Sequence, residues 1–398
     1  MPSHLKSKIQ QAATSSLNEI IDIRRHLHAN PELSFEEYKT SEFIASLLKK
    51  YNIPFTTGIV KTGIVGIIEG KNPSKKVIAL RADMDALPIT EANNCEYKSK
   101  NIGVMHACGH DVHSASLLGA AKILNELKNE FEGTIKLFFQ PGEEKLPGGA
   151  SLMIQEGVLE NPHTQTIFGQ HVFPTMEAGK VGFRNGMYMA STDEIYIKVI
   201  GKGGHAAMPK DYNSPLLIAS RIMLELNKEF MQQEQPAPTV LAFGKIVGNG
   251  ATNVIPDEVN IEGTFRTLNE EWRREAKVKM KALAEKIAKE MGGVCEYVIE
   301  NGYPFLVNDV PTTTRARAAA EDYLGKENVE ELPLRMTAED FAFFSQKVPA
   351  CFYRLGTANK ARGITSGVHT ATFDIDEKAL EIGAGLMAWL AVNELEGK

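Results

Sequence analysis

The sequence predicts an α/β protein in which one domain is inserted into another. The chain has 398 residues, 43% of them hydrophobic, which is enough for two hydrophobic cores. Apolar strand-like runs and helical segments make up residues 1–189 and 302–398, as expected for a discontinuous domain with a largely parallel central sheet and helices on both faces. Residues 190–301 instead have the βαββαβ order of a ferredoxin-like α+β module.

The composition limits the classes of partner. Charged residues make up 24% of the chain and the formal net charge is −6, with no basic cluster, which argues against nucleic acid. Residues 1–30 lack the apolar core of a signal peptide, and the apolar run 384–392 is too short to span a bilayer. The four cysteines are widely scattered, as in proteins of a reducing compartment. We therefore expect a cytoplasmic protein with no membrane partner.

Periodicity and β propensity place the elements of the outer domain. Helices are predicted at 5–28, 36–50 and 114–127. Strands are predicted at 63–69, 77–81, 134–139, 166–169 and 350–355. Four strands are followed by polar side chains that can bind metals or protons, namely Asp85, Glu144, His171 and His369. Because ligands bind beyond the carboxyl ends of strands in open α/β sheets, we expect these side chains to meet along one edge.

The segment VMHACGHDVH at 104–113 is the densest in chemically active side chains. Cys108 and His110 stand two residues apart, so an extended or looped backbone lets both side chains face one point. Thiolate and imidazole suit a divalent metal such as zinc. With Glu144, His171 and His369 they make five candidate ligands, more than one tetrahedral site holds. The set indicates two metal ions about 3.5–4 Å apart that share a bridging ligand and a water.

The adjacent glutamates Glu143 and Glu144 then divide into one metal ligand and one proton carrier, because a general base cannot be occupied as a ligand. The alternative is that the pair forms a solvated acidic turn. A lone histidine is also more often structural than a ligand. The repeated placement of candidate ligands after strands favours the metal centre over both alternatives.

Alternation and helical spacing also place the elements of the inserted module. Its strands are predicted at 193–200, 239–246, 259–267 and 294–299, and its helices at 215–230 and 271–291. Pro215 stands in a first-turn position, where its missing N–H costs nothing. All five candidate ligands lie outside this module.

Seven motifs occur together and in order: RRHLHANPELSFEE (24–37), LRADMDALPI (80–89), VMHACGHDVH (104–113), FFQPGEE (138–144), GKGGHAAMP (201–209), NVIP (253–256) and GTFRT (263–267). They resemble the amidohydrolase branch of the aminoacylase and carboxypeptidase G-like dinuclear metallopeptidases. That branch includes hippurate hydrolases, auxin-conjugate (indole-acetyl-amino acid) hydrolases and N-acetyl-diaminopimelate deacetylases. The resemblance covers nearly the whole chain.

The resemblance implies roles for individual residues. Two divalent ions per subunit (Zn, Mn, Co or Ni) would be bound by Cys108, His110, Glu144, His171 and His369. Glu143 would be the general acid/base, and Asp85 would orient a ligand, while contact of Asp83 with metal is left open. His205, Asn253 and Arg266 match positions near the substrate. Lys145-Leu146-Pro147 departs from the glycine run usual in the branch, so the pocket wall there is expected to differ.

The resemblance also implies an activity and an assembly. The activity is hydrolysis of the amide bond of N-acyl-L-amino acids to a carboxylic acid and a free amino acid. A dipeptidase or carboxypeptidase activity is the alternative on the same scaffold. Two alternatives of another class are a catalytically silent metal- or peptide-binding protein and a redox role for Cys108. The inserted module is expected to act as a lid and to form a homodimer in which His205 reaches the partner's active site.

Overall fold

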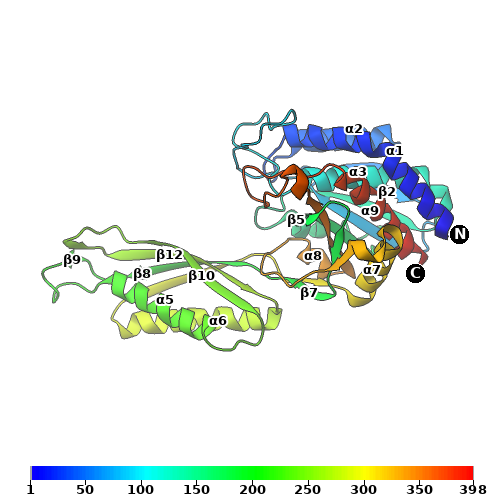
Figure 1. The fold of residues 1–398 in the computed structure, drawn as a ribbon. Coiled ribbons are helices and arrows are strands. Elements are labelled where there is room, and N and C mark those ends of the chain that lie inside the picture. The colour runs from blue at the N-terminus through cyan, green and yellow to red at the C-terminus, as the bar shows by residue number, and fades with distance from the viewer. Residues whose placement is uncertain (1, 398) are drawn as a thin grey trace. The chain divides into compact units, whose positions relative to one another are not determined.

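The computed structural model describes residues 2–397, and its chain divides into two compact units (Figure 1). The first, here the outer unit, comprises Met1–Gly186, Val307–Pro333 and Asp340–Lys398. The second, here the inserted unit, comprises Met187–Leu306 and Leu334–Glu339. Two short strands, β7 (Gly186–Met189) and β14 (Leu306–Asn308), lie where the chain passes from one unit to the other.

An eight-stranded sheet forms the centre of the outer unit, in the order β1-β2-β4-β3-β5-β16-β6-β15. The strands are β1 (Phe55–Ile59), β2 (Gly63–Glu69), β3 (Val77–Asp83), β4 (Thr134–Gln140), β5 (Thr166–Glu177), β6 (Val181–Phe183), β15 (Val329–Glu331) and β16 (Ala350–Ala358). The four central strands, β4, β3, β5 and β16, are parallel, whereas β1, β2 and β6 pair antiparallel with their inner neighbours. The predicted, largely parallel fold class is confirmed.

Helices cover both faces of this sheet. They are α1 (Pro2–Ala29), α2 (Tyr38–Lys50), α3 (His110–Glu126), α4 (Gly149–Gln155), α7 (Val310–Leu324), α8 (Ala342–Ser345) and α9 (Ala379–Glu396). On β5, Gly169 lies against the ring of Phe341 at the start of α8, whereas the next residue, Gln170, contacts Gly383 of α9. Alternate residues of a strand point to opposite faces, so α8 and α9 cover opposite faces. Every residue of β3, β4 and β16 is buried as a result.

Two predicted boundaries are wrong in places that affect the site. The helix predicted from residue 114 begins at His110, because Gly109 takes a left-handed φ of 83° as its N-cap and the buried polar residues after it are already helical. The strand predicted to end at 169 continues to Glu177, since the buried apolar pattern continues through Val172 and Met176. His171 therefore lies within β5 and not beyond its end.

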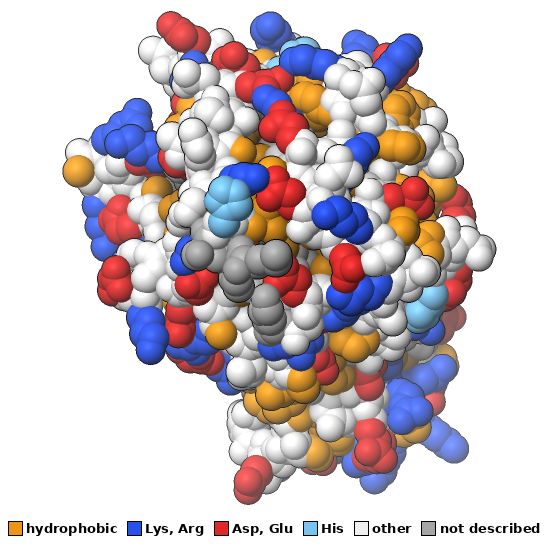
Figure 2. Space-filling model, turned by 90° about the vertical axis from the view of Figure 1, so that its right-hand side faces the viewer, with side chains coloured by type: hydrophobic (Ala, Val, Ile, Leu, Met, Phe, Trp, Pro, Cys, Tyr) orange, Lys and Arg blue, Asp and Glu red, His pale blue; other side chains and the backbone are white. Residues whose placement is uncertain are grey.

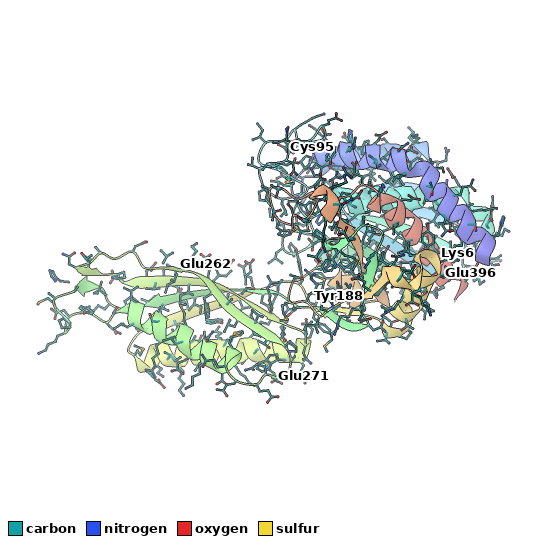
Figure 3. The ribbon with its side chains drawn as sticks, viewed as in Figure 1. Lys6, Cys95, Tyr188, Glu262, Glu271 and Glu396 are labelled. Atoms are coloured by element: carbon teal, nitrogen blue, oxygen red, sulfur yellow. The ribbon has the colours of Figure 1, made fainter. Side chains whose placement is uncertain are left out.

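The inserted unit is a four-stranded antiparallel sheet in the order β10-β12-β8-β13 with two helices (Figure 1). Its elements are β8 (Asp193–Ile200), α5 (Pro215–Met231), β10 (Thr239–Val247), β12 (Glu258–Thr267), α6 (Glu270–Glu290) and β13 (Val294–Asn301). Glu262 on β12 and Glu271 on α6 mark the sheet and the helix layer in Figure 3. This is the predicted ferredoxin-like βαββαβ order. A short ribbon of β9 (Gly204–His205) and β11 (Val254–Ile255) stands apart from the main sheet.

Within residues 2–397 we find no helix long and apolar enough to cross a membrane. On the face shown in Figure 2, lysine and arginine side chains lie among aspartate and glutamate side chains, with apolar side chains between them.

A buried ion pair anchors the first strand of the inserted unit. Asp193 of β8 is fully buried and accepts hydrogen bonds from Arg273 Nε at 2.7 Å and Nη2 at 2.8 Å, with Lys277 Nζ at 3.2 Å. Arg273→Leu removes the closest partner of a buried charge, so we expect a loss of about 3–5 kcal/mol in the free energy of unfolding, measured by urea denaturation. Lys286→Ala removes an exposed pair with Glu290 and should cost less than ~0.5 kcal/mol. Equal losses would contradict this account.

Candidate metal centre

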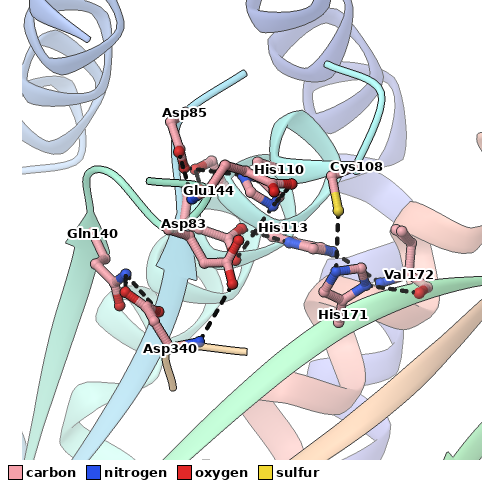
Figure 4. Close-up of polar contacts among 12 residues, drawn as sticks. Asp83, Asp85, Cys108, His110, His113, Gln140, Glu144, His171, Val172 and Asp340 are labelled. Atoms are coloured by element: carbon pink, nitrogen blue, oxygen red, sulfur yellow. Dashed lines mark hydrogen bonds and ion pairs between the residues drawn. The ribbon is translucent and has the colours of Figure 1, made fainter. Parts of the chain in front are cut away.

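The candidate site lies at the carboxyl end of the parallel strands. Asp83 ends β3 and Gln140 ends β4, so the Glu143-Glu144 turn and the strand end at Asp83 are neighbours in the sheet. His171 lies on β5, the strand on the other side of β3. The loop before α3 brings Cys108 and His110 to the same edge (Figure 4).

Gly109 allows Cys108 and His110 to converge on His171. Its φ of 83° is left-handed, and a Cβ there would lie 2.6 Å from Cγ2 of Val172 on β5. Only glycine satisfies both conditions without strain. The loop therefore passes directly against β5, with Cys108 Sγ 3.4 Å from His171 Nε2.

The structure brings the five predicted ligands together in two groups that share one member. Cys108, His110 and His171 form one group, and the donor atoms within it lie within 4.8 Å of one another. Cys108, Glu144 and His369 form the second group under the same limit. Glu144 Oε1 lies 3.2 Å from His369 Nε2. The Cys108 sulfur is thus placed to serve both groups.

The histidine tautomers fit a bound cation. His171 Nδ1 donates to the carbonyl of Val172 at 2.8 Å, which leaves Nε2 with a free lone pair facing Cys108. His110 Nδ1 lies 3.1 Å from Asp85 Oδ1, and its buried Nε2 has no hydrogen-bond partner. Histidines that bind metal commonly donate their other N–H to a carboxylate or carbonyl in this way. The donor set of thiol, imidazoles and carboxylate suits a divalent transition metal.

Electrostatics also favour a cation at this position. Burial alone would lower the pKa of His110, but Asp83, Asp85 and Glu144 outweigh it and raise that pKa to about 10. These carboxylates stabilise positive charge on or beside the ring, and a metal ion at Nε2 would take the place of the proton there. Burial, with Arg354 nearby, holds the pKa of His171 well below its usual value, so this imidazole is neutral as a ligand must be. Burial and the glutamates raise the pKa of the Cys108 thiol, an effect that a bound cation reverses.

The side chains of Asp83 and His113 are hydrogen-bonded to each other. His113 Nε2 accepts the N–H of Val172 at 2.9 Å, so Nδ1 carries the proton and donates to Asp83 Oδ1 at 2.6 Å. The other Asp83 oxygen accepts from Arg81 Nη1 at 2.6 Å and lies 3.8 Å from His110 Nε2. His113 has no nitrogen left for a metal, and both Asp83 oxygens already accept hydrogen bonds.

Several residues at the site were not predicted. Arg81 donates to Gln140 Oε1 at 2.8 Å and to Asp340 Oδ1 at 2.7 Å, and the backbone N–H of Asp340 lies 3.3 Å from Glu143 Oε1. Arg81 could have been predicted, because an arginine that follows a run of apolar residues in a buried strand must have buried partners. Asp340 could not, since a segment distant in sequence brings it to the site.

The three predicted substrate-binding residues lie in two different parts of the inserted unit. His205 of β9 is exposed and pairs with Val254 of β11, directly after Asn253. This ribbon lies beyond the Glu258 end of β12, where Gly203 N donates to Asp257 Oδ1 at 2.8 Å. Arg266 lies near the opposite end of β12 and donates to the carbonyl of Met336 at 3.4 Å. From Glu258 to Arg266 the strand rises by about 26 Å, at ~3.3 Å per residue.

The atypical segment after the glutamates forms part of a cavity wall. A cavity of about 650 Å³ is lined by Ser34, Phe35, Glu36, Tyr38, Val60, Lys61, Lys145, Leu146, Pro147 and Leu152. Lys145 directly follows Glu144 in the sequence. The three residues that stand in place of the usual glycine run therefore line a cavity whose wall begins directly after Glu144.

Comparisons with known proteins identify the family of the chain. The model of peptidase family M20/M25/M40 matches residues 79–393. An N-acyl-L-amino acid amidohydrolase of Geobacillus stearothermophilus is 40% identical over 304 residues, covering 76% of this chain and 81% of that protein. Thermostable carboxypeptidase 2 of Saccharolobus solfataricus is 39% identical over 378 residues, covering 94% and 95%.

A solved structure also matches the fold of this chain. The YXEP protein of Bacillus subtilis, described as a dinuclear metal binding peptidase from the M20 family, superposes with a TM-score of 0.82. It is 34% identical, and the match covers 96% of this chain and 99% of that one. The resemblance inferred from the motifs is confirmed. The chain belongs to peptidase family M20/M25/M40 and is a metal-dependent amidohydrolase.

Proposed function

We propose that the enzyme hydrolyses the amide bond of N-acyl-L-amino acids, with an N-acetyl, N-benzoyl or similar acyl group. The observation that carries the proposal is the pair of donor groups sharing Cys108, with one further buried carboxylate, Glu143, beside them. The amidohydrolase of Geobacillus stearothermophilus, 40% identical, supports this substrate class.

Two divalent ions fit the two donor groups. Cys108, His110 and His171 would hold one, and Cys108, Glu144 and His369 the other. Zn, Mn, Co and Ni all accept this mixture of thiolate, imidazole and carboxylate. When bound, such ions activate water and polarise a carbonyl oxygen.

The protein's own residues supply orientation and proton transfer. Asp85 holds the His110 ring through Nδ1, so that Nε2 faces the site. Glu143 is buried, with its carboxylate near the backbone N–H of Asp340. It would take a proton from the attacking water on a carboxylate oxygen and deliver it to the amine nitrogen that leaves. A group serving both steps must be free of metal, which is the role left to Glu143 once Glu144 is a ligand.

A substrate panel tests the proposal. Metal-reconstituted protein is assayed for amino-acid release from N-acetyl and N-benzoyl amino acids and from free dipeptides. The proposed function predicts turnover of the acylated amino acids. Preference for free dipeptides would instead favour the exopeptidase alternative, which the 39% identical carboxypeptidase supports.

We also propose a homodimer through the inserted unit, because His205 and Arg266 cannot reach one small substrate from a single chain. Arg266 lies about 26 Å along β12 from Glu258, and the ribbon that holds His205 lies beyond the Glu258 end of this strand. The edge strands β10 and β13 offer surfaces for pairing between copies. Arg266 would bind the substrate carboxylate in a bidentate manner. His205 and Asn253 of the other chain would contact the same substrate, with His205 stabilising the oxyanion.

Mixing two inactive variants tests the shared site. His205→Ala should lower kcat by ~10²–10³-fold, the usual loss for one oxyanion donor. Co-refolding His205→Ala with Glu143→Gln should restore part of the activity, because one site of each mixed dimer then contains neither substitution. Mixed dimers that form but stay inactive would mean that His205 does not act across an interface. Sedimentation at assay concentration checks that dimers are present.

A further inference from the structure

The turn at Ser34–Glu37, which ends the motif RRHLHANPELSFEE, has no role in the mechanism described so far. Glu37 in this turn is completely buried. Its Oε1 accepts the backbone N–H groups of Phe35 at 2.9 Å and Gly142 at 2.8 Å, and its Oε2 accepts the Thr62 hydroxyl at 2.7 Å. One carboxylate thus joins three separate segments, one of which directly precedes Glu143.

The contact at Gly142 is tight. Gly142 has a left-handed φ of 61°, and a Cβ there would overlap the ring of Phe35. Phe35 itself has a φ of 65°, a conformation that costs free energy for an aromatic residue. The hydrogen bond from the Phe35 N–H to Glu37 holds this conformation, so the ring stays against the backbone that leads into Glu143.

The same turn also reaches the other end of the glutamate segment. Ser34 Oγ donates to Asp85 Oδ2 at 2.6 Å, and the same oxygen accepts the N–H of Glu144 at 3.0 Å. Asp85 is also the residue that orients His110. The Ser34–Glu37 turn therefore holds the backbone at Gly142 directly and at Glu144 through Asp85, with Glu143 between them.

We propose that Glu37 is a positioning residue that fixes the backbone of Gly142–Glu144, and with it the directions of the Glu143 and Glu144 side chains. The inference rests on the roles proposed above for these two glutamates. A buried carboxylate is costly, and burial together with Asp85 raises the pKa of Glu37 to about 7. An apolar residue would fill the space at lower cost but could not bind three donors at once.

The test compares two substitutions of Glu37. Glu37→Ala removes the acceptor, and a displacement of about 1 Å at a reacting group costs ~10²-fold in rate, so we expect kcat to fall by about that factor with KM nearly unchanged. Glu37→Gln keeps an oxygen for both backbone N–H groups, and its amide can donate to the Thr62 oxygen. It should therefore recover most of the lost kcat.

Cobalt supplies a second measurement. In protein loaded with Co(II), the visible bands report the geometry around the ion, including its Glu144 ligand. We expect these bands to shift in Glu37→Ala and to match the wild type in Glu37→Gln. If Glu37→Ala does not fold, Thr62→Val, which loosens the carboxylate by removing one donor, should show a smaller shift and a smaller loss of kcat in the same direction.

Glu394→Ala is the matched control. Glu394 is also buried, and it accepts from Lys76 Nζ at 2.7 Å and Arg315 Nη2 at 2.8 Å near the start of β3, at the end of the sheet away from the site. Its loss should lower Tm without changing kcat or the cobalt bands. If Glu37→Ala behaves in the same way, Glu37 is only structural and the inference is overturned. If wild-type protein binds no cobalt, the proposed metal centre fails, and the inference fails with it.

Discussion

Glu143→Gln is expected to abolish nearly all turnover while leaving the metal content close to that of the wild type. The amide has the shape of the carboxylate but cannot accept a proton from the attacking water. General acid–base groups contribute roughly 10²–10⁴-fold, and a group that serves two proton transfers contributes toward the upper end. The measurements are kcat on an N-acyl amino acid and metal content by mass spectrometry of the dialysed protein.

Glu144→Gln is the matched control for this prediction, because it makes the same change one residue later. Its side chain lies with Cys108 and His369, so this variant should lose metal as well as activity. The opposite pattern, with metal lost from Glu143→Gln and kept in Glu144→Gln, would show that the two roles are reversed.

Cys108→Ser is expected to bind metal much more weakly and to lose most of its activity. Cys108 belongs to both donor groups, so replacing its sulfur affects both ions, and a hydroxyl is a far poorer ligand than a thiolate. Competition against a chromophoric chelator measures the affinity of each ion. Loss of metal in only one group would show that Cys108 serves that group alone.

Cys351→Ala separates this effect from the general cost of changing a buried cysteine. Cys351 lies on β16, is completely buried and belongs to neither donor group. Its substitution should lower stability by the cost of a small cavity and leave metal affinity unchanged. Full activity and undiminished metal binding in Cys108→Ser would mean that Cys108, too, is only a packing residue.

Much of this fold could be predicted because its signals are local. The apolar runs of β3 and β4 indicate strands that are buried on both faces. The period-two pattern of β8 indicates a strand that is buried on one face. Glu144 was a candidate ligand because it follows β4, and Cys108 and His110 were candidates because of the motif around them, whereas the place predicted for His171 beyond a strand end was wrong. Each of these patterns can be recognised from residues that are close together in the sequence.

The rest depends on contacts between distant segments. Asp340 reaches Arg81 and Gln140 from far along the chain, and Glu37 reaches Gly142 across the outer unit. No local pattern distinguishes such a carboxylate from a solvated one. The early start of α3 was missed for a different reason, because its first turn is polar and buried and shows no amphipathic periodicity.

The position of β16 has a consequence for the synthesis of the chain. This strand lies between β5 and β6 at the centre of the sheet, yet it is translated after the whole inserted unit. A nascent chain must therefore carry β5 with one edge unpaired while the nearly contiguous inserted unit emerges and can already fold. An open strand edge is a template for pairing with other chains. The half-made outer unit is therefore open to such pairing until β16 is translated, and the last candidate ligand, His369, is translated later still.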